Sequence, residues 1–271
     1  MAITALSDSA QNHLKTIWSL TEWSEEPVTA AALAQALGLR RSTVSDALKR
    51  LREQGLVEHA PYGTVTLTPV GRQHAVAMVR RHRLIETFLV ETLGYTWDQV
   101  HDEAEVLEHS VSEFMVERIA QVLGNPEHDP HGDPIPAADG TIQRPDALPL
   151  TALLERMGEA RTTGSDPELT VTVARISDVD PAVLQDFAAL GLGVGSRLQL
   201  VLSSLGARST AETASTAEAA SAADVAGAVS SGVVRLLPED ASTLDADLMT
   251  LRPEHVASLY VSLETPDPEA G

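Results

Sequence analysis

The spacing of apolar residues changes once along this chain, and the change limits the folds that it can adopt. Up to residue 124 apolar residues recur at helical intervals, as do Leu14, Ile17 and Trp18 after the cap-like Ser7. From residue 169 onward, short runs alternate apolar and polar residues in the manner of strands. We therefore predict a mainly α-helical protein that carries a small β module.

The first 72 residues predict a winged helix-turn-helix. Two short helices are expected over residues 28–38 and 42–54, the second with Ser42 as its N-cap, and a β-hairpin should follow around Tyr62 and Gly63. Two helices joined by a tight turn and then a hairpin are typical of DNA-binding domains.

Residues 73–138 predict a helical domain that self-associates. Helices are expected over residues 71–94 and 96–124, and both are apolar on more than one face. The apolar positions are Val76, Leu84, Phe88, Leu89, Phe114, Met115, Ile119 and Leu123. Residues 139–168 have the composition of a linker, and residues 169–271 should form the β module, with a low-complexity insertion at about residues 207–231.

The charge is divided unevenly along the chain. The net charge is −20, yet residues 1–90 contain ten Lys or Arg against eight Asp or Glu, so the first ninety residues carry +2 and the rest −22. Only the N-terminal part is therefore suited to a polyanion such as DNA. No segment is long and apolar enough to span a membrane, and no signal peptide is evident, so a cytoplasmic location is expected.

Residues 101–110, HDEAEVLEHS, concentrate acidic and imidazole groups on one helix face. At about 100° per residue, His101, Glu105, Glu108 and His109 fall within one arc. His82 and Glu86 form a second pair four residues apart on the preceding helix, and the full candidate set is His82, Glu86, His101, Glu105, Glu108 and His109. A solvated acidic face would explain one such pair, but six groups on two adjacent helices are harder to explain in this way. Carboxylates packed this closely repel one another, and a divalent cation is the simplest group that offsets the repulsion.

Three classes of function fit these residues to different extents. The chain has no cysteine, so a metal would be held by oxygen and imidazole nitrogen. A metal-dependent hydrolase explains the cluster alone, and we find no nucleophile motif or phosphate loop, so no catalytic residue and no small-molecule substrate are predicted. A metal-independent helical regulator explains the DNA-binding pattern alone. A metal-triggered DNA-binding protein explains both.

Four segments in order carry a family resemblance: the helix-turn-helix with its wing, MVRRHRLIETFL, HDEAEVLEHSVS and DPHGDPIP. Together they resemble the metal-dependent repressors of the diphtheria toxin repressor and manganese transport regulator (DtxR/MntR) family. The resemblance covers residues 8–138 closely and the β module loosely. It implies a homodimer that binds palindromic operators when loaded with metal, and a C-terminal small β-barrel like that of the ferrous-transport accessory protein (FeoA-like).

The resemblance also implies two metal sites. The ancillary site corresponds to His82, Glu86 and His101, completed by Asp180 from the barrel, whereas a further glutamine ligand of iron-type members has no counterpart. The regulatory site corresponds to Asn12, Glu105, Glu108 and His109. A further acidic ligand of some manganese-type members falls at Lys15, so that contact is absent from this chain.

Ligand chemistry favours manganese. Mn(II) binds weakly in the Irving–Williams order and is favoured only by oxygen-rich sites without sulfur, such as Glu105, Glu108, Asn12 and His109. We predict a Mn(II)-dependent repressor of metal-uptake genes, with Fe(II) as the alternative metal and with Zn(II) or Co(II) binding in vitro.

The resemblance places the start of the third helix in the major groove of double-stranded operator DNA. Arginine and hydroxyl side chains suit phosphate contacts, while Ser42 and Asp46 could meet base edges. Asp46 equally fits a charge stabilised by the dipole at a helix N-terminus. The predicted DNA-binding residues are Arg40, Arg41, Ser42, Thr43, Ser45, Asp46 and Arg50.

Overall fold

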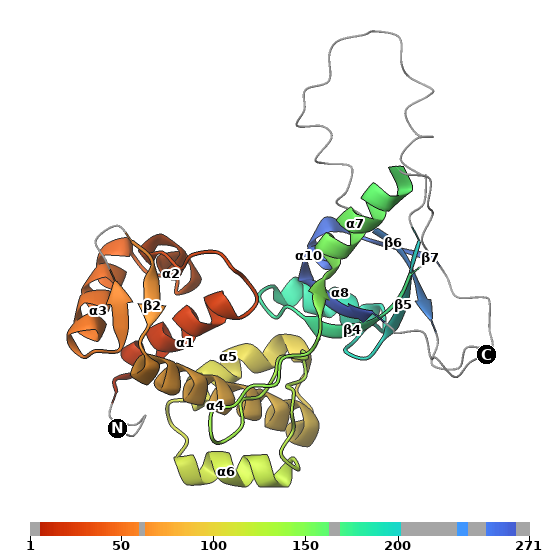
Figure 1. The fold of residues 1–271 in the computed structure, drawn as a ribbon. Coiled ribbons are helices and arrows are strands. Elements are labelled where there is room, and N and C mark those ends of the chain that lie inside the picture. The colour runs from red at the N-terminus through yellow and green to blue at the C-terminus, as the bar shows by residue number, and fades with distance from the viewer. Residues whose placement is uncertain (1–5, 60–62, 163–168, 202–231, 238–247, 264–271) are drawn as a thin grey trace. The chain divides into compact units, whose positions relative to one another are not determined.

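The computed structural model describes residues 6–59, 63–162, 169–201, 232–237 and 248–263 (Figure 1). These residues form two compact units, and each is described by itself. The first contains most of residues 1–143, and the second contains residues 97–99, 130–133 and the chain from residue 144 onward. Among the helices that the structure describes, none combines the length and the apolar character needed to cross a bilayer. The predicted insertion at residues 207–231 lies outside the described residues.

The first unit begins with the predicted winged helix-turn-helix. Its elements are α1 (Asp8–Glu22), α2 (Ala30–Ala36), α3 (Arg41–Glu53), β1 (Val57–His59) and β2 (Val65–Leu67), with the two strands antiparallel. Leu14, Ile17 and Trp18 of α1 are buried and pack with Val44 and Leu48 of α3 in one core. Helix α3 is thus packed on the apolar face of α1.

Side-chain caps begin two of these helices. The Ser7 hydroxyl accepts from Ala10 N–H at the start of α1, as predicted, and Thr29 does the same for α2. The predicted cap at Ser42 is wrong: α3 starts at Arg41, its N-cap residue is Arg40, and that cap has no side-chain hydrogen bond. Ser42 lies instead in the exposed first turn of α3.

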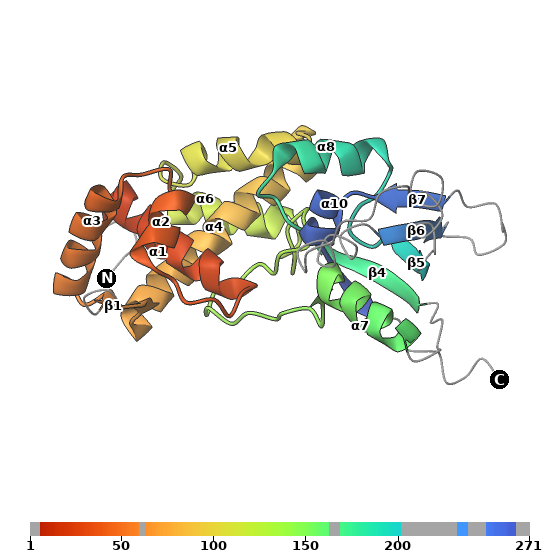
Figure 2. The same ribbon diagram turned by 90° about the horizontal axis from the view of Figure 1, so that it is seen from above.

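A long helix, α4 (Pro69–Leu93), follows the hairpin and packs against α1 (Figure 2). The Thr68 hydroxyl accepts from Gly71 N–H, and proline is the first helical residue, where it has no hydrogen-bond partner to lose. Gly71 has no substitute, because a Cβ there would lie 1.9 Å from the carbonyl oxygen of Leu56. The close approach fixes the hairpin on the start of α4.

The single helix predicted over residues 96–124 is two helices, α5 (Trp97–Leu107) and α6 (Glu113–Val122). Leu107 O accepts from the N–H groups of Ser110 and Val111, which closes the end of α5. The Ser112 hydroxyl then accepts from Met115 N–H and starts α6. The break keeps the two helices separate on a shared core with the second half of α4.

Buried ion pairs join α1 to α4. The Arg83 guanidinium donates to both carboxylate oxygens of Glu22, at 3.0 and 2.5 Å, and to the carbonyl oxygen of Pro134 at 2.8 Å. Asp129 lies 3.6 Å from the same guanidinium. All three charged side chains are buried, so the end of α1 is held in place by a buried cluster of ion pairs.

The second unit is the predicted β module. Its elements are β3 (Leu148–Pro149), α7 (Leu150–Thr162), β4 (Leu169–Ile176), α8 (Pro181–Ala189), β5 (Arg197–Val201), β6 (Gly232–Leu237), β7 (Leu248–Leu251), α10 (Pro253–Ser258) and β8 (Leu259–Leu263). The strands form one antiparallel sheet in the order β3-β8-β4-β5-β6-β7. Leu150 and Leu154 of α7 pack with Val171 and Phe187 in its core. The segment that we expect to be a linker therefore contains α7 and contributes to this core.

Candidate metal centre

Two helices of the first unit carry the predicted ligands at matched spacing. His82 and Glu86 lie four residues apart on α4, and His101 and Glu105 lie four residues apart on α5. Each pair therefore points in one direction. Packing of α5 on the α4 core brings the two pairs together.

Glu108 and His109 reach the site from the turn after α5 rather than from the helix itself. Glu108 N–H still donates to Ala104 O at 2.9 Å, so Glu108 keeps the direction expected from the helical period. Its side chain is completely buried. Asp102 and Glu103 are exposed, as their positions outside the arc indicate.

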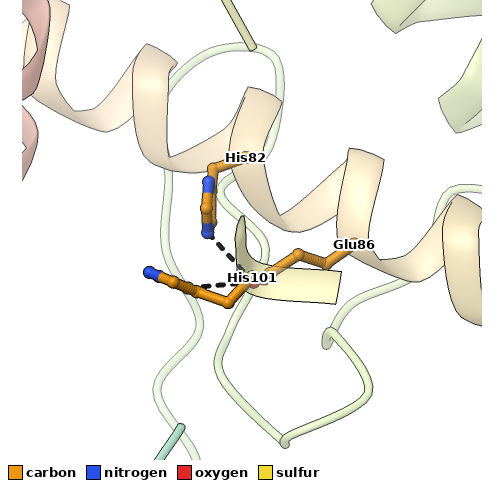
Figure 3. A group of neighbouring side chains, drawn as sticks. All are labelled: His82, Glu86 and His101. Atoms are coloured by element: carbon orange, nitrogen blue, oxygen red, sulfur yellow. Dashed lines mark ion pairs between the residues drawn. The ribbon is translucent and has the colours of Figure 1, made fainter. Parts of the chain in front are cut away.

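The first cluster consists of His82, Glu86 and His101 (Figure 3). Glu86 Oε1 lies 3.0 Å from His82 Nε2 and 3.4 Å from His101 Nδ1. The two imidazole rings meet edge to face at a centroid distance of 5.0 Å. Ligand atoms of all three residues lie within 4.8 Å of one another, which suits a single divalent cation.

The second cluster consists of His82, Glu105 and Glu108, whose ligand atoms also lie within 4.8 Å of one another. His82 Nδ1 is 2.7 Å from Glu108 Oε2, so this ring contacts both clusters. Lys15 of α1 inserts its ammonium between the carboxylates, with Nζ donating to Glu105 Oε1 and Glu108 Oε1 at 2.6 Å each.

The buried charges shift one another's protonation. Burial alone lowers the pKa of His82, but the carboxylates of Glu86 and Glu108 outweigh it and hold that pKa above the ordinary value. Burial alone raises the pKa of Glu108, but His82 and the Lys15 ammonium hold it below the ordinary value. Glu108 is therefore a buried carboxylate kept ionised by cations, the state required of a metal ligand.

The first helix contributes further polar groups to the site. Gln11 Oε1 lies 3.0 Å from His109 Nδ1, and His109 Nε2 lies 3.5 Å from Glu108 Oε1. Asn12 Oδ1 is buried and has no hydrogen-bond partner among the described residues. A buried side-chain carbonyl oxygen of this kind suits a hard divalent cation.

The predicted ligands do not all lie in one unit. His82, Glu86, His101, Glu105 and Glu108 meet in the two clusters of the first unit. In the second unit, Asp180 accepts from Ala182 N–H and caps α8. His131 and Asp178 of that unit, neither of which the sequence pointed to, have ligand atoms within 4.8 Å of each other.

Lys15 and Gln11 are the contributors that sequence reasoning missed in the first unit. Together with Glu22 they are polar residues on the buried side of α1, where the helical period requires burial. A polar residue at such a position needs a buried partner. That signal was present in the sequence, although it does not identify the partner.

The predicted DNA-binding residues all lie on the exposed side of α3 and at its N-cap. Val44, Ala47 and Leu48 face the core, which leaves the opposite side of the helix free for solvent or a ligand. The Ser45 hydroxyl donates to Arg41 O at 2.9 Å. The exposed residues are Arg40, Arg41, Ser42, Thr43, Ser45, Asp46 and Arg50.

Comparisons with known proteins agree with this arrangement. Residues 5–65 match the family description "Iron dependent repressor, N-terminal DNA binding domain", and residues 68–137 match "Iron dependent repressor, metal binding and dimerisation domain". A solved manganese-dependent transcriptional repressor in complex with manganese is 40% identical, with a TM-score of 0.74, over 94% of this chain and 100% of that chain.

Two curated relatives extend the likeness. The diphtheria toxin repressor of Corynebacterium diphtheriae is 31% identical over 72% of this chain and 85% of its own length. The iron-dependent repressor IdeR of Mycobacterium leprae is 38% identical over 57% of this chain, and the match spans 66% of that relative, just under two thirds. The winged helix-turn-helix, the two carboxylate–histidine clusters and these matches together show that the chain belongs to the diphtheria toxin repressor family of metal-dependent transcriptional repressors, which are DNA-binding proteins and not enzymes.

Proposed function

We propose that this chain is a Mn(II)-dependent repressor that binds palindromic operators of metal-uptake genes as a homodimer. The observation that carries the proposal is the meeting of α1 with the metal centre. Leu14 and Ile17 of α1 lie in the core of the DNA-binding domain, while Gln11 and Lys15 of the same helix contact His109 and Glu108.

A link of this kind makes DNA binding responsive to metal. When bound, a divalent cation supplies the positive charge that holds the carboxylates of Glu105 and Glu108 together. Asn12 then offers its buried Oδ1 from α1, so the orientation of the DNA-binding domain depends on the state of the centre. The exposed side of α3 is the part of that domain that faces DNA in this proposal.

Exposed apolar side chains on α6 support a homodimer. Phe114 is 77% exposed and Met115 is 47% exposed, although both are large and apolar. A second copy of the chain that covers Phe114 and Met115 would give a dimer with two copies of α3, as a palindromic operator requires.

The donor set supports manganese over iron. The clusters offer carboxylate oxygen and imidazole nitrogen, and the chain has no cysteine to favour softer ions. The manganese-bound relative supports the same choice, whereas the iron-dependent IdeR relatives favour Fe(II) as the second candidate.

Selection from random DNA tests the proposal without knowledge of the operator. Purified metal-free protein is incubated with a random duplex pool and Mn(II), anaerobic Fe(II), Zn(II), Co(II) or chelator, and bound DNA is sequenced. We expect a palindromic sequence to be enriched with Mn(II) and not with chelator, and genomic copies of it to lie upstream of metal-uptake genes. Equal enrichment with chelator would contradict metal dependence, and enrichment with Fe(II) alone would identify iron as the metal.

A further inference from the structure

Lys15 occupies the position between the two carboxylates where a divalent cation would be expected. Its Nζ lies 2.6 Å from Glu105 Oε1 and 2.6 Å from Glu108 Oε1, and 3.3 Å from His82 Nδ1. The residue is only 7% exposed, so its ammonium has exchanged water for these partners. Its partners are therefore the residues of the His82–Glu105–Glu108 cluster.

The lysine is unusual within the chain itself. The chain has two lysines, Lys15 and the exposed Lys49 of α3, and the other 17 of its 19 Lys and Arg residues are arginines. Arginine holds carboxylates with a rigid planar fork, as Arg83 does with Glu22. An ammonium is a compact point charge on a flexible stem, and so it can both fill a cation position and leave it.

Charge balance indicates what the lysine does there. Without Lys15, the Glu105 and Glu108 carboxylates would lie within 4.8 Å of each other. Imidazoles would remain beside them, His101 next to Glu105 and both His82 and His109 next to Glu108. The ammonium removes that repulsion in the absence of metal. A divalent cation bound by the same two oxygens would be repelled by an ammonium beside it, so the two cations compete for one position.

We propose that Lys15 is a tethered cation that competes with metal for Glu105 and Glu108. Metal binding at this cluster is then an exchange, in which the ammonium withdraws as the divalent cation enters. The competition lowers the affinity for metal and sets the concentration at which the protein responds. This inference rests on the proposed function, because it takes the His82–Glu105–Glu108 cluster to be a metal site.

The first test measures metal affinity directly. Mn(II) binding to metal-free protein is followed from the electron paramagnetic resonance signal of free Mn(II) for the wild type, Lys15→Met and Lys49→Met. Methionine keeps an unbranched apolar stem and removes the charge, and Lys49→Met removes the same charge from an exposed position. We expect Lys15→Met to bind Mn(II) about tenfold more tightly or better, since a neighbouring charge shifts ionic equilibria by about one to three powers of ten, and Lys49→Met to match the wild type.

The outcomes separate this inference from the proposed function. Equal or weaker binding by Lys15→Met, with normal binding by the wild type, overturns the inference and leaves the proposed function intact. Binding by Lys15→Met alone would show that the lysine blocks the site instead of exchanging with metal, and it would contradict both the exchange and a Mn(II)-responsive wild type. Binding by neither protein contradicts both.

The second test uses the wild type and does not depend on how a variant folds. The protein is treated with an amine-acetylating reagent with and without Mn(II), and acetylation of Lys15 is compared with that of Lys49 by mass spectrometry of peptides. We expect Mn(II) to accelerate acetylation of Lys15 severalfold relative to Lys49, because the expelled amine reaches solvent. Unchanged or slower acetylation with Mn(II) would show that the ammonium stays in place.

Discussion

At the scale of single residues, His82 connects the two clusters through its two ring nitrogens. Nε2 lies 3.0 Å from Glu86 Oε1, and Nδ1 lies 2.7 Å from Glu108 Oε2. A cation held at Nε2 would fix the orientation of the ring and so the position of Nδ1 beside Glu108. The two clusters are therefore chemically coupled through one imidazole.

A substitution at Glu105 tests whether its carboxylate determines the metal selectivity of the site. Glu105→Cys replaces a hard oxygen with a soft thiolate, so we expect Zn(II) and Co(II) to gain at least about tenfold in affinity relative to Mn(II). Competition titrations of the two proteins with pairs of these ions measure the change. Glu103→Cys on the exposed side of α5 is the matched control and should retain the wild-type ranking. If Glu105→Cys keeps that ranking as well, Glu105 does not bind metal.

At the scale of elements, α1 is joined to its neighbours by buried charged groups as well as by apolar packing. The Glu22 carboxylate and the Arg83 guanidinium are both buried and doubly hydrogen-bonded. Removal of one member of such a pair leaves an uncompensated buried charge, which is far more costly than the net gain from the pair itself.

Arg83→Met should therefore destabilise the protein strongly. We expect the free energy of unfolding to fall by about 3–5 kcal/mol in urea titrations of the metal-free protein. Arg80→Met is the control one turn earlier on α4, where Arg80 also donates to a loop carbonyl but pairs with the half-exposed Glu117 at 3.7 Å. Arg80→Met should lower the free energy of unfolding by about 1 kcal/mol. Equal losses in the two variants would mean that the buried pair has no special role.

The exposed apolar side chains of α6 make a second prediction at this scale. Met115→Asp should weaken the homodimer by about tenfold or more, because a carboxylate would be buried without a partner in the interface. Analytical ultracentrifugation at several protein concentrations measures the change. Val179→Asp alters a side chain that is 85% exposed in the second unit, and it should leave the dimer intact. A wild type that sediments as a monomer with metal bound would contradict the homodimer.

The sequence predicted elements better than their ends or their long-range contacts. Periodicity identified α1 and the hairpin because each buries one regular face, and it also identified α4, whose buried residues lie on more than one face. It missed the break between α5 and α6, since residues 108–112 contain no glycine or proline and the Ser112 cap is visible only once the chain has turned. It also missed the contact of Lys15 with Glu108, which are 93 positions apart, because no local pattern specifies such a pair.

At the scale of the whole molecule, the uneven charge makes association with DNA a property of one region. Residues 1–90 carry +2 and the rest −22, so most of the surface repels DNA. If the protein binds DNA as proposed, encounter should favour approaches in which the N-terminal region faces the DNA.

Salt dependence should report this preference. Arg41→Gln should lower the affinity for the selected operator and reduce the slope of log affinity against log salt by about one, as expected for one lost phosphate contact. Fluorescence anisotropy at several salt concentrations measures both values. Arg156→Gln on α7 removes the same charge from an exposed position of the second unit and should change neither. If the slope of log affinity against log salt is unchanged in Arg41→Gln, Arg41 does not contact a DNA phosphate.

The two charged attachments of α1 give this helix the mechanics of a lever. Glu22 is held by Arg83, and Lys15, seven residues earlier, is held by Glu108. The two residues are separated by about 10 Å along the helix axis. A displacement of about 1 Å at Lys15 over that distance tilts the axis by roughly 6° if the Glu22 end stays fixed as a fulcrum. Because α3 shares a core with the middle of this segment, we expect small movements at the carboxylates to rotate α3, the helix that reads DNA in the proposed function.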